Sequence, residues 1–247
     1  MNLNEGVLQT FEQTEVKSVD KKKFDNELHS LIIFKRSAKY LKCLNLFLKR
    51  MIDVLGALIG TIILIPLTVV VFIGNRICKD KGPIFYTQER IGQYGKTFKM
   101  YKFRSMVVDA EKKLEDLLES DERVKEEYGV FKKLKDDPRV TKFGTFIRKT
   151  SLDEFPQFIN VLKGEMSLVG PRAYLLSEKE DMGEMYHIII QHNPGITGMW
   201  QVSGRSNVTF EERLNIDWDY HQNSSLFLDI QILFKTVFAV LKKNGAE

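Results

Sequence analysis

The sequence predicts a mostly helical α+β protein that combines a membrane-embedded segment with a larger folded domain. Three observations indicate this fold class. An uncharged apolar run covers residues 54–75, apolar residues recur at helical spacing in several later segments, and residues 82–106 mix aromatic residues with turn glycines. The chain has 247 residues, enough for one large domain or two small ones.

The apolar run is long enough to enter a bilayer. Leu, Ile and Val dominate it, and at ~1.5 Å per helical residue it is about 30 Å long, which matches a hydrocarbon core. It begins too late, is too long and lacks a small-residue cleavage site, so it is not a signal peptide. The sequence therefore predicts membrane association.

The segments before this run differ in composition. Residues 1–30 are polar and lack sustained periodicity, so we expect a loosely ordered tail. Residues 31–53 mix apolar residues with Lys and Arg, which is typical of a basic amphipathic helix on an anionic membrane surface. An ordinary surface helix is the alternative.

Pro66 lies near the middle of the apolar run, where it removes a backbone hydrogen bond and kinks or breaks the helix. Basic residues flank both ends of the run, so the positive-inside rule assigns no orientation. The helix could bend at Pro66 and return to the same face, or cross once with a tolerated proline. The residues alone favour the single span slightly.

The later segments predict helices joined by loops. A charged amphipathic helix is expected over 109–135 and a short helix over 157–163 that stops at Gly164. Further helices are expected over 174–192, 208–222 and 226–243, the last apolar enough to touch membrane or core. The stretches "GEMSLVGPRAYL" and "NPGITGMWQVSGRSN" predict a tight loop and a glycine-rich loop region.

Composition excludes several classes of site. Cys43 and Cys78 show no paired spacing, which argues against a disulfide framework or a thiolate metal site and suits a reducing compartment. The four histidines show no H-x-x-x-H spacing, so no histidine metal site is expected. The net charge of +4 is ordinary, and we expect no nucleic-acid partner.

The stretch "RKTSLDEFPQ", residues 148–157, places two carboxylates side by side. Ser151 to Glu154 fits the capping box S-x-x-E, in which both acids would serve only a helix N-terminus. Pro156 disfavours that box, because it would then be the fifth helical residue and would lose a hydrogen bond. With Asp153 as the cap, Pro156 falls within the first turn.

The same pair also suits chemistry on phosphates. A carboxylate can attack an activated phosphorus centre, and a neighbouring carboxylate can bind Mg²⁺. Arg148, Arg172 and Arg205 could hold phosphate oxygens in a bidentate fork. The sequence has no P-loop or strand-anchored G-x-G-x-x-G, which disfavours an ATPase or a dinucleotide enzyme. Sequence-adjacent carboxylates also rarely reach the separation that glycosidases need.

Five motifs occur in an order that resembles a known family: "KFRSM" (102–106), "DPRVTKFG" (137–144), "RKTSLDEFPQ" (148–157), "NVLKGEMSLVGPR" (160–172) and "PGITGMWQVSGR" (194–205). From about residue 45 onward the chain resembles the bacterial sugar transferases, monotopic polyprenyl-phosphate glycosyl-1-phosphate transferases. The resemblance implies an enzyme, a phosphotransferase for substituted phosphate groups. It would move a sugar 1-phosphate from a UDP-sugar to undecaprenyl phosphate with Mg²⁺ and release UMP.

The resemblance also implies residue roles. Asp153 would be the nucleophile that forms a phosphosugar intermediate, Glu154 the Mg²⁺ ligand, and Arg148, Arg172 and Arg205 phosphate-binding residues. Pro66 would be the break of a re-entrant membrane helix, which reverses the preference for a single span. The implied organisation is a polar tail over 1–35, an interfacial and re-entrant segment over 36–78, and a cytoplasmic catalytic domain with interfacial amphipathic helices over 79–247.

The chain departs from the family pattern at Ala173, where Pro is usual, and at Glu165, where Asp is commoner. Larger members carry a further membrane domain, so we expect a short form. "WQVSGR" resembles members that use glucose or galactose. The implied location is the cytoplasmic face of a bacterial inner membrane, in capsule or exopolysaccharide synthesis, as a homodimer and beside downstream glycosyltransferases. A non-catalytic scaffold that binds polyprenyl phosphate and a single-pass receptor or anchor are the competing hypotheses.

Overall fold

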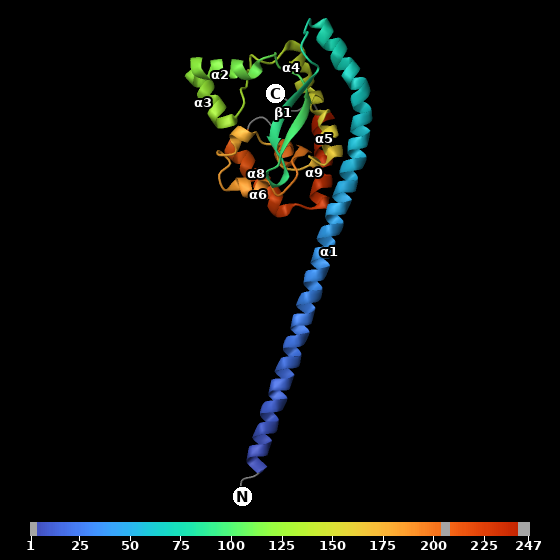
Figure 1. Cartoon of the computed structure of the whole chain (residues 1–247), viewed down its shortest axis with the longest axis vertical. Coiled ribbons are helices and arrows are strands. Elements are labelled where there is room, and N and C mark those ends of the chain that lie inside the picture. Colours follow the sequence, from blue (N-terminus) through green and yellow to red (C-terminus); the bar gives the residue numbers. More distant parts are fainter. Residues whose placement is uncertain (1–3, 204–207, 242–247) are drawn as a thin grey trace. The chain divides into compact units, whose positions relative to one another are not determined.

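The computed structural model describes residues 4–203 and 208–241, with side chains from residue 39 to residue 239 within those ranges and for His29. Within that part the protein is mostly helical with short strands, which confirms the α+β class (Figure 1). The longer helices are α1 (Asn4–Ile77), α2 (Ala110–Ser120), α3 (Glu122–Phe131), α8 (Phe210–Asn223) and α9 (Leu226–Leu241). Shorter ones are α4 (Lys142–Lys149), α5 (Gln157–Lys163), α6 (Met185–Ile189), α7 (Met199–Ser203) and the 3₁₀ turns η1 (Gln93–Gly95), η2 (Leu152–Glu154) and η3 (Leu176–Glu178).

The chain divides into two units, residues 1–48 and 49–247. In the first unit α1 is already helical from Asn4, so the expectation of a loosely ordered tail is wrong. Residues 4–30 contain no proline and only one glycine, and a helix that is already nucleated extends readily through such residues.

In the second unit α1 continues through Pro66 to Ile77, so the expected break of the helix is not seen. Figure 1 shows a curve in this part of α1, which is how a long helix accommodates a proline whose neighbouring turns stay hydrogen-bonded. In the part of the chain that the structure describes, one helical segment, Lys39–Ile77, is long and apolar enough to cross a membrane. The re-entrant path remains a prediction.

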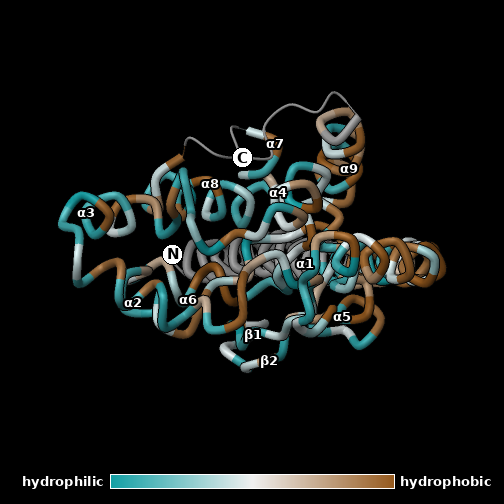
Figure 2. Tube along the Cα trace, turned by 90° about the horizontal axis from the view of Figure 1, so that it is seen from above, coloured by the Kyte–Doolittle hydropathy of each residue, from teal (hydrophilic) through white to brown (hydrophobic). Residues whose placement is uncertain are grey.

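The later part of α1 has two distinct faces. Ala57, Leu64 and Val71, seven residues apart, are buried at 0%, 6% and 0% exposure against the domain. Leu55, Ile62 and other large apolar residues of the opposite face are exposed. Hydrophobic residues dominate this part of α1 and also α9 (Figure 2). A helix with one face on protein and one exposed apolar face suits lipid contact.

Glycines allow α1 to approach the domain closely. A Cβ atom at Gly60 would overlap the Phe158 ring of α5, and one at Gly74 would overlap the Phe143 ring of α4. Two of the apolar core clusters include α1 residues, Ala57 in one and Leu64 and Val71 in the other. The packing of α1 is therefore continuous with the interior of the domain.

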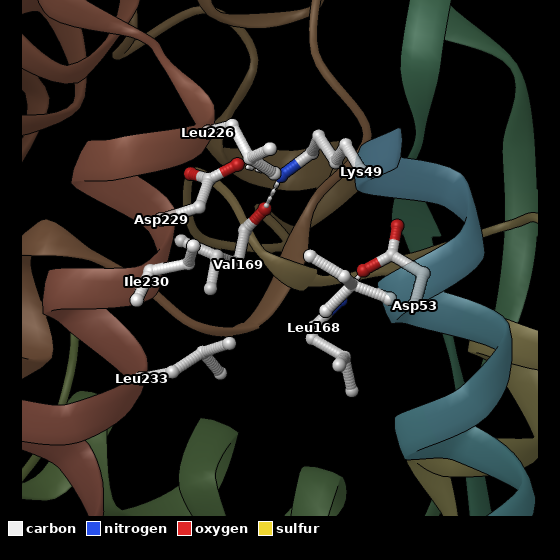
Figure 3. Close-up of a pocket in the computed structure, with 9 residues that line it drawn as sticks. Lys49, Asp53, Leu168, Val169, Leu226, Asp229, Ile230 and Leu233 are labelled. Carbon is white, nitrogen blue, oxygen red and sulfur yellow. Dashed lines mark hydrogen bonds and ion pairs between the residues drawn. The ribbon is translucent and has the colours of Figure 1, made fainter. Parts of the chain in front are cut away.

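Charged residues of α1 at the start of this unit also bind it to α9, β3 (Ser167–Val169) and α5. Lys49 Nζ donates to Asp229 Oδ2 of α9 at 2.7 Å and to the Val169 carbonyl at 2.8 Å (Figure 3). Arg50 donates to the Val161 carbonyl at 2.8 Å. Asp53 Oδ1 accepts from the Leu168 amide at 2.8 Å. Lys49 and Arg50 flank the apolar run in sequence, and in the fold both side chains bind other parts of the protein.

Two small sheets complete the fold. Strands β1 (Phe85–Ile91) and β2 (Thr97–Phe103) form an antiparallel hairpin within the aromatic, turn-rich segment 82–106. Strands β3 (Ser167–Val169) and β4 (Gly195–Thr197) pair in parallel within segments that were expected to be loops. That pairing places the "GPR" turn beside the "PGITG" turn.

Two helix predictions need correction. The helix expected over 109–135 is split, because the Asp121 side chain accepts from the Arg123 amide at 3.0 Å and starts α3 separately. The segment 174–192 holds only η3 and α6, because Glu178 Oε2 takes the Leu175 amide at 2.7 Å and Gly183 adopts φ 53°. By contrast, α5 does end at Gly164, which has φ 79°.

Candidate active site

Asp153 and Glu154 lie in η2, a 3₁₀ turn directly before α5. Ser151 precedes this turn with φ 55° and makes no side-chain cap hydrogen bond, so the capping-box interpretation is wrong. Pro156 is the residue that begins α5, at its N-cap, where a missing N–H costs no helical hydrogen bond. The pair therefore stands at the start of a helix without serving as its cap.

Asp153 is buried although it carries a carboxylate, with 8% of its surface exposed. Burial, together with the charge of the neighbouring Glu154, raises the pKa of Asp153 to about 6, whereas Lys102 and Arg148 oppose the shift. At neutral pH the carboxylate is mostly ionised and poorly solvated. A desolvated anion of this kind is a competent nucleophile.

Two cations from different elements face the pair. Lys102 Nζ of β2 lies 3.3 Å from Glu154 Oε1 and 4.0 Å from Asp153 Oδ2. Arg148, near the end of α4, acts electrostatically on Asp153, and its Nε donates to Ser105 Oγ at 2.9 Å. We call Lys102, Arg148, Asp153 and Glu154 the carboxylate site. It unites the predicted Asp153, Glu154 and Arg148.

Lys102 is a residue that the sequence prediction missed. Its signal is its place in "KFRSM", at the end of a predicted extended segment. Two hydrogen bonds of Asn160 in α5 explain how Lys102 comes close to the two carboxylates. Asn160 Oδ1 accepts from the Tyr101 amide at 3.0 Å and its Nδ2 donates to the Lys99 carbonyl at 2.8 Å. These bonds dock α5, and the η2 turn before it, onto the edge of β2.

A buried ion pair between Arg139 and Asp137 lies close enough to Arg148 to act on it electrostatically. Arg139 binds Asp137 in a fork, with Nη2 to Oδ2 at 2.6 Å and Nε to Oδ1 at 2.8 Å. The charges of Asp137 and Arg139 both affect the pKa of Arg148. The carbonyl of Ser105, whose hydroxyl binds Arg148, accepts a hydrogen bond from the Thr141 amide at 3.0 Å. The motif "DPRVTKFG" therefore builds the frame that orients Arg148.

Arg172 does not join the carboxylate site. It lies with Arg90 of β1 and Arg213 of α8, which we call the arginine cluster. Arg172 Nη2 donates to Glu178 Oε1 at 3.2 Å, and its guanidinium lies 5.4 Å from the centre of the Tyr174 ring. Arg205, the remaining predicted phosphate-binding residue, lies outside the described residues.

The hairpin register separates the two groups. Tyr86 pairs with Lys102, and Arg90 comes four residues further along β1, which is about 13 Å at the rise of a strand. The two groups therefore stand along one hairpin.

Arg90 and Arg213 were also missed in the sequence. The sequence did contain a pattern that indicates burial of Arg213. The i, i+3, i+4, i+7 spacing of a buried helix face is followed by Phe210, Arg213, Leu214 and Asp217. Two charged residues at core-facing positions are exceptional. Arg90 carried no comparable signal, because its burial follows from the loop that packs on β1: Arg90 Nη1 donates to the Ala173 carbonyl at 2.8 Å.

Among the described residues, no group of three or more His, Cys, Asp or Glu side chains could hold a metal by itself. The two adjacent carboxylates of Asp153 and Glu154 nevertheless supply oxygen donors of the kind that Mg²⁺ prefers. The Glu154 side chain is 35% exposed and so is reachable from solvent. The chemistry of the donors thus fits Mg²⁺.

Comparison with known proteins follows the same motifs. The profile of the family "Bacterial sugar transferase" matches residues 44–243. The chain is 46% identical over 219 residues to the UDP-galactose-lipid carrier transferase of Erwinia amylovora, covering 88% of this chain and 45% of that protein. It is 42% identical over 218 residues to the undecaprenyl-phosphate galactose phosphotransferase of Salmonella typhimurium, covering 88% and 46%.

A third relative is similar in length. The exopolysaccharide production protein ExoY of Sinorhizobium fredii is 43% identical over 198 residues, covering 80% of this chain and 87% of that protein. The chain spans about half the length of the Erwinia and Salmonella relatives. The profile match covers most of the sequence and includes the carboxylate site and the arginine cluster. This chain belongs to the bacterial sugar transferase family.

Proposed function

We propose that this protein transfers a sugar 1-phosphate from a UDP-sugar to undecaprenyl phosphate through a covalent intermediate on Asp153. The observation that carries the proposal is the buried Asp153 carboxylate, held between Lys102 and Arg148 at the start of a helix. The names of the Salmonella relative and of the glucose-1-phosphate transferase of Klebsiella pneumoniae support the reaction class.

The proposed chemistry has two balanced steps. In the first, an Asp153 carboxylate oxygen bonds to the phosphorus that carries the sugar, and the bond from that phosphorus to the UMP oxygen breaks. In the second, a phosphate oxygen of undecaprenyl phosphate attacks the same phosphorus, and the Asp153 carboxylate leaves. Lys102 and Arg148 stabilise the negative charge on the phosphoryl oxygens in both steps.

Glu154 is the residue that would hold Mg²⁺, with the diphosphate of the donor supplying further oxygens. When bound, the metal would neutralise the diphosphate and stabilise the departing UMP. Lys102 Nζ lies 3.3 Å from Glu154 Oε1 and so holds the Glu154 carboxylate in place within the carboxylate site.

The exposed apolar faces suit a reaction between a water-soluble donor and a lipid acceptor. α9 exposes a row of large residues, and α1 exposes its outer face; those of α9 are Phe227, Ile230, Phe234, Val237 and Phe238. We infer a site held at the cytoplasmic face of a bacterial inner membrane by the apolar faces of α1 and α9. The galactose and glucose named in the relatives make a UDP-hexose the first donor to test.

The deciding experiment measures UMP release by the purified chain with undecaprenyl phosphate, Mg²⁺ and a panel of UDP-sugars. We expect one UDP-hexose to release UMP, and Asp153→Asn to abolish the release. Asp219→Asn, an exposed residue of α8, is the matched control and should keep full activity. If no UDP-sugar reacts, the catalytic proposal fails and a scaffold that binds polyprenyl phosphate becomes the better hypothesis.

A further inference from the structure

The segment formed by η2 and α5 carries a row of buried polar residues. Asp153, Gln157 and Asn160 follow the i, i+4, i+7 spacing of one helical face, and they are 8%, 2% and 0% exposed. The two residues that join η2 to α5 keep right-handed helical backbone angles, so this spacing applies across both elements. Gln157 therefore lies one helical turn after the carboxylate pair, on the buried face that also carries Asp153.

The two ends of this row have partners, whereas its middle has none. Asn160 binds β2 through two hydrogen bonds, and its Nδ2 also donates to Glu165 Oε2 at 2.7 Å. Asp153 faces Lys102 at 4.0 Å. Gln157 makes no side-chain hydrogen bond to any residue that the structure describes. A buried amide without a partner costs stability, so this one calls for an explanation.

The amide of Gln157 is nevertheless open to a ligand. The fully enclosed side-chain atoms that lack a partner among the described residues do not include its Oε1 or Nε2. The small exposed part of Gln157 thus includes its amide. This amide has two N–H donors, and donors are what phosphoryl oxygens require.

Gln157 would approach the nucleophile from a third direction. Lys102 reaches Asp153 from β2 and Arg148 acts on it from α4, whereas Gln157 belongs to α5. The two cations also oppose the raised pKa of Asp153, so they affect the carboxylate as well as any phosphate. A neutral amide adds donors for phosphoryl oxygens and no further positive charge.

We propose that Gln157 is a catalytic residue whose amide donates a hydrogen bond to an oxygen of the phosphoryl group that Asp153 receives and releases. This inference rests on the proposed transfer through Asp153 and deepens it. The bonds that form and break are those of the two transfer steps, and Gln157 keeps its protons throughout. Because the amide has no partner before the phosphoryl group arrives, its hydrogen bond forms only along the reaction, where it accelerates the transfer.

The test compares Gln157→Met with the wild type, each as the full chain purified in nanodiscs. Methionine keeps the length and volume of the side chain and removes both N–H donors. We expect kcat for UMP release to fall about 10- to 100-fold, with the KM for the UDP-sugar changed less than about 3-fold. The free energy of unfolding without ligands should be equal or higher, because an unpartnered buried amide is gone. Gln222→Met, at an exposed position of α8, is the matched control and should change neither quantity.

The Gln157→Glu variant separates donation from shape. An ionised glutamate has the shape of glutamine but only accepts hydrogen bonds, so we expect a loss of kcat at least as large as in Gln157→Met. Wild-type kcat in Gln157→Glu would overturn the donor role. If Gln157→Met fails to fold, Gln157→Leu replaces it with the same expectation, and wild-type kcat in either folded variant would refute the proposal.

Phosphate binding tests Gln157 independently of turnover. The probe is inorganic phosphate with Mg²⁺, followed by the rise in melting temperature, and Arg148→Met defines the part of that rise that comes from the carboxylate site. We expect Gln157→Met to weaken this part several-fold, even if no UDP-sugar is turned over. An Arg148-dependent rise that is absent from the wild type, or unchanged in Gln157→Met, would refute the role of Gln157. The transfer reaction itself stands or falls with UMP release by the wild type.

Discussion

Around Asp153 one buried carboxylate faces two cations, whereas around Arg172 three guanidiniums and a lysine face three carboxylates, those of Asp217, Glu178 and Glu127. At the carboxylate site the cations oppose the effect of burial on one carboxylate. In the arginine cluster charges of both signs are buried together, and both donors and the acceptor Asp217 Oδ1 lack partners among the described residues. The comparison teaches that charge is buried in two ways here, around one reactive carboxylate and in a network of arginines and acids.

The largest expected effect comes from Asp153→Asn. Removal of a nucleophile should lower activity by about 10³-fold or more. Because the folded pKa is raised from 3.8 to about 6, the ionised carboxylate costs stability above pH 6 and not below pH 4. The free energy of unfolding of the variant should therefore be higher by about 3 kcal/mol at pH 8, from the pKa difference. Chemical denaturation at pH 8 and pH 4 checks the sign, and an equal gain at both pH values would contradict it.

Lys102→Met tests whether the cation tunes Asp153. Lys102 lowers the pKa of Asp153, so its removal should raise that pKa and leave less ionised carboxylate at neutral pH. We expect UMP release to fall about 10- to 100-fold at pH 7 and to recover partly at pH 9. A pH–rate profile measures the shift. Lys99→Met, exposed on the same strand, should keep the wild-type profile.

Gly60→Val distinguishes the two regions by their dependence on α1. The added atoms would meet the Phe158 ring, and forced overpacking costs about 1–3 kcal/mol. The disturbance reaches α5 and the carboxylate site, so turnover should fall. The arginine cluster should stay undisturbed, because the apolar cluster beneath it has no α1 residue. Gly129→Val, with no atom within 4 Å of its Cβ, is the control. Wild-type turnover by Gly60→Val would contradict this dependence on α1.

Ser105→Ala should have the smallest effect. It removes the acceptor of Arg148 Nε and so loosens a guanidinium that acts on Asp153. A lost hydrogen bond of this kind costs about 1 kcal/mol, so we expect a several-fold drop in turnover and little change in melting temperature. Steady-state kinetics on the purified variant checks both quantities. Ser120→Ala, at the exposed end of α2, is its control.

Part of the candidate site could be predicted from the sequence. The adjacent acids in "RKTSLDEFPQ" and the nearby Arg148 share one short stretch, so local sequence places them together. Arg172 was expected beside them but lies in the arginine cluster, because Glu178 and Asp217 hold it there. Lys102 and Arg90 escaped prediction because their partners are far along the chain. The hairpin register and the docking of Asn160 bring Lys102 to Glu154.

The sequence by itself determined the apolar run over residues 54–75 and the helices α5, α8 and α9. Composition, periodicity and turn residues act within a few positions, so such elements are local. Only the tertiary structure decided that α1 continues through Pro66, that Lys49 and Arg50 bind the domain, and that three distant arginines meet. The physical reason is that burial and charge pairing depend on contacts between segments remote in sequence, which no local pattern encodes.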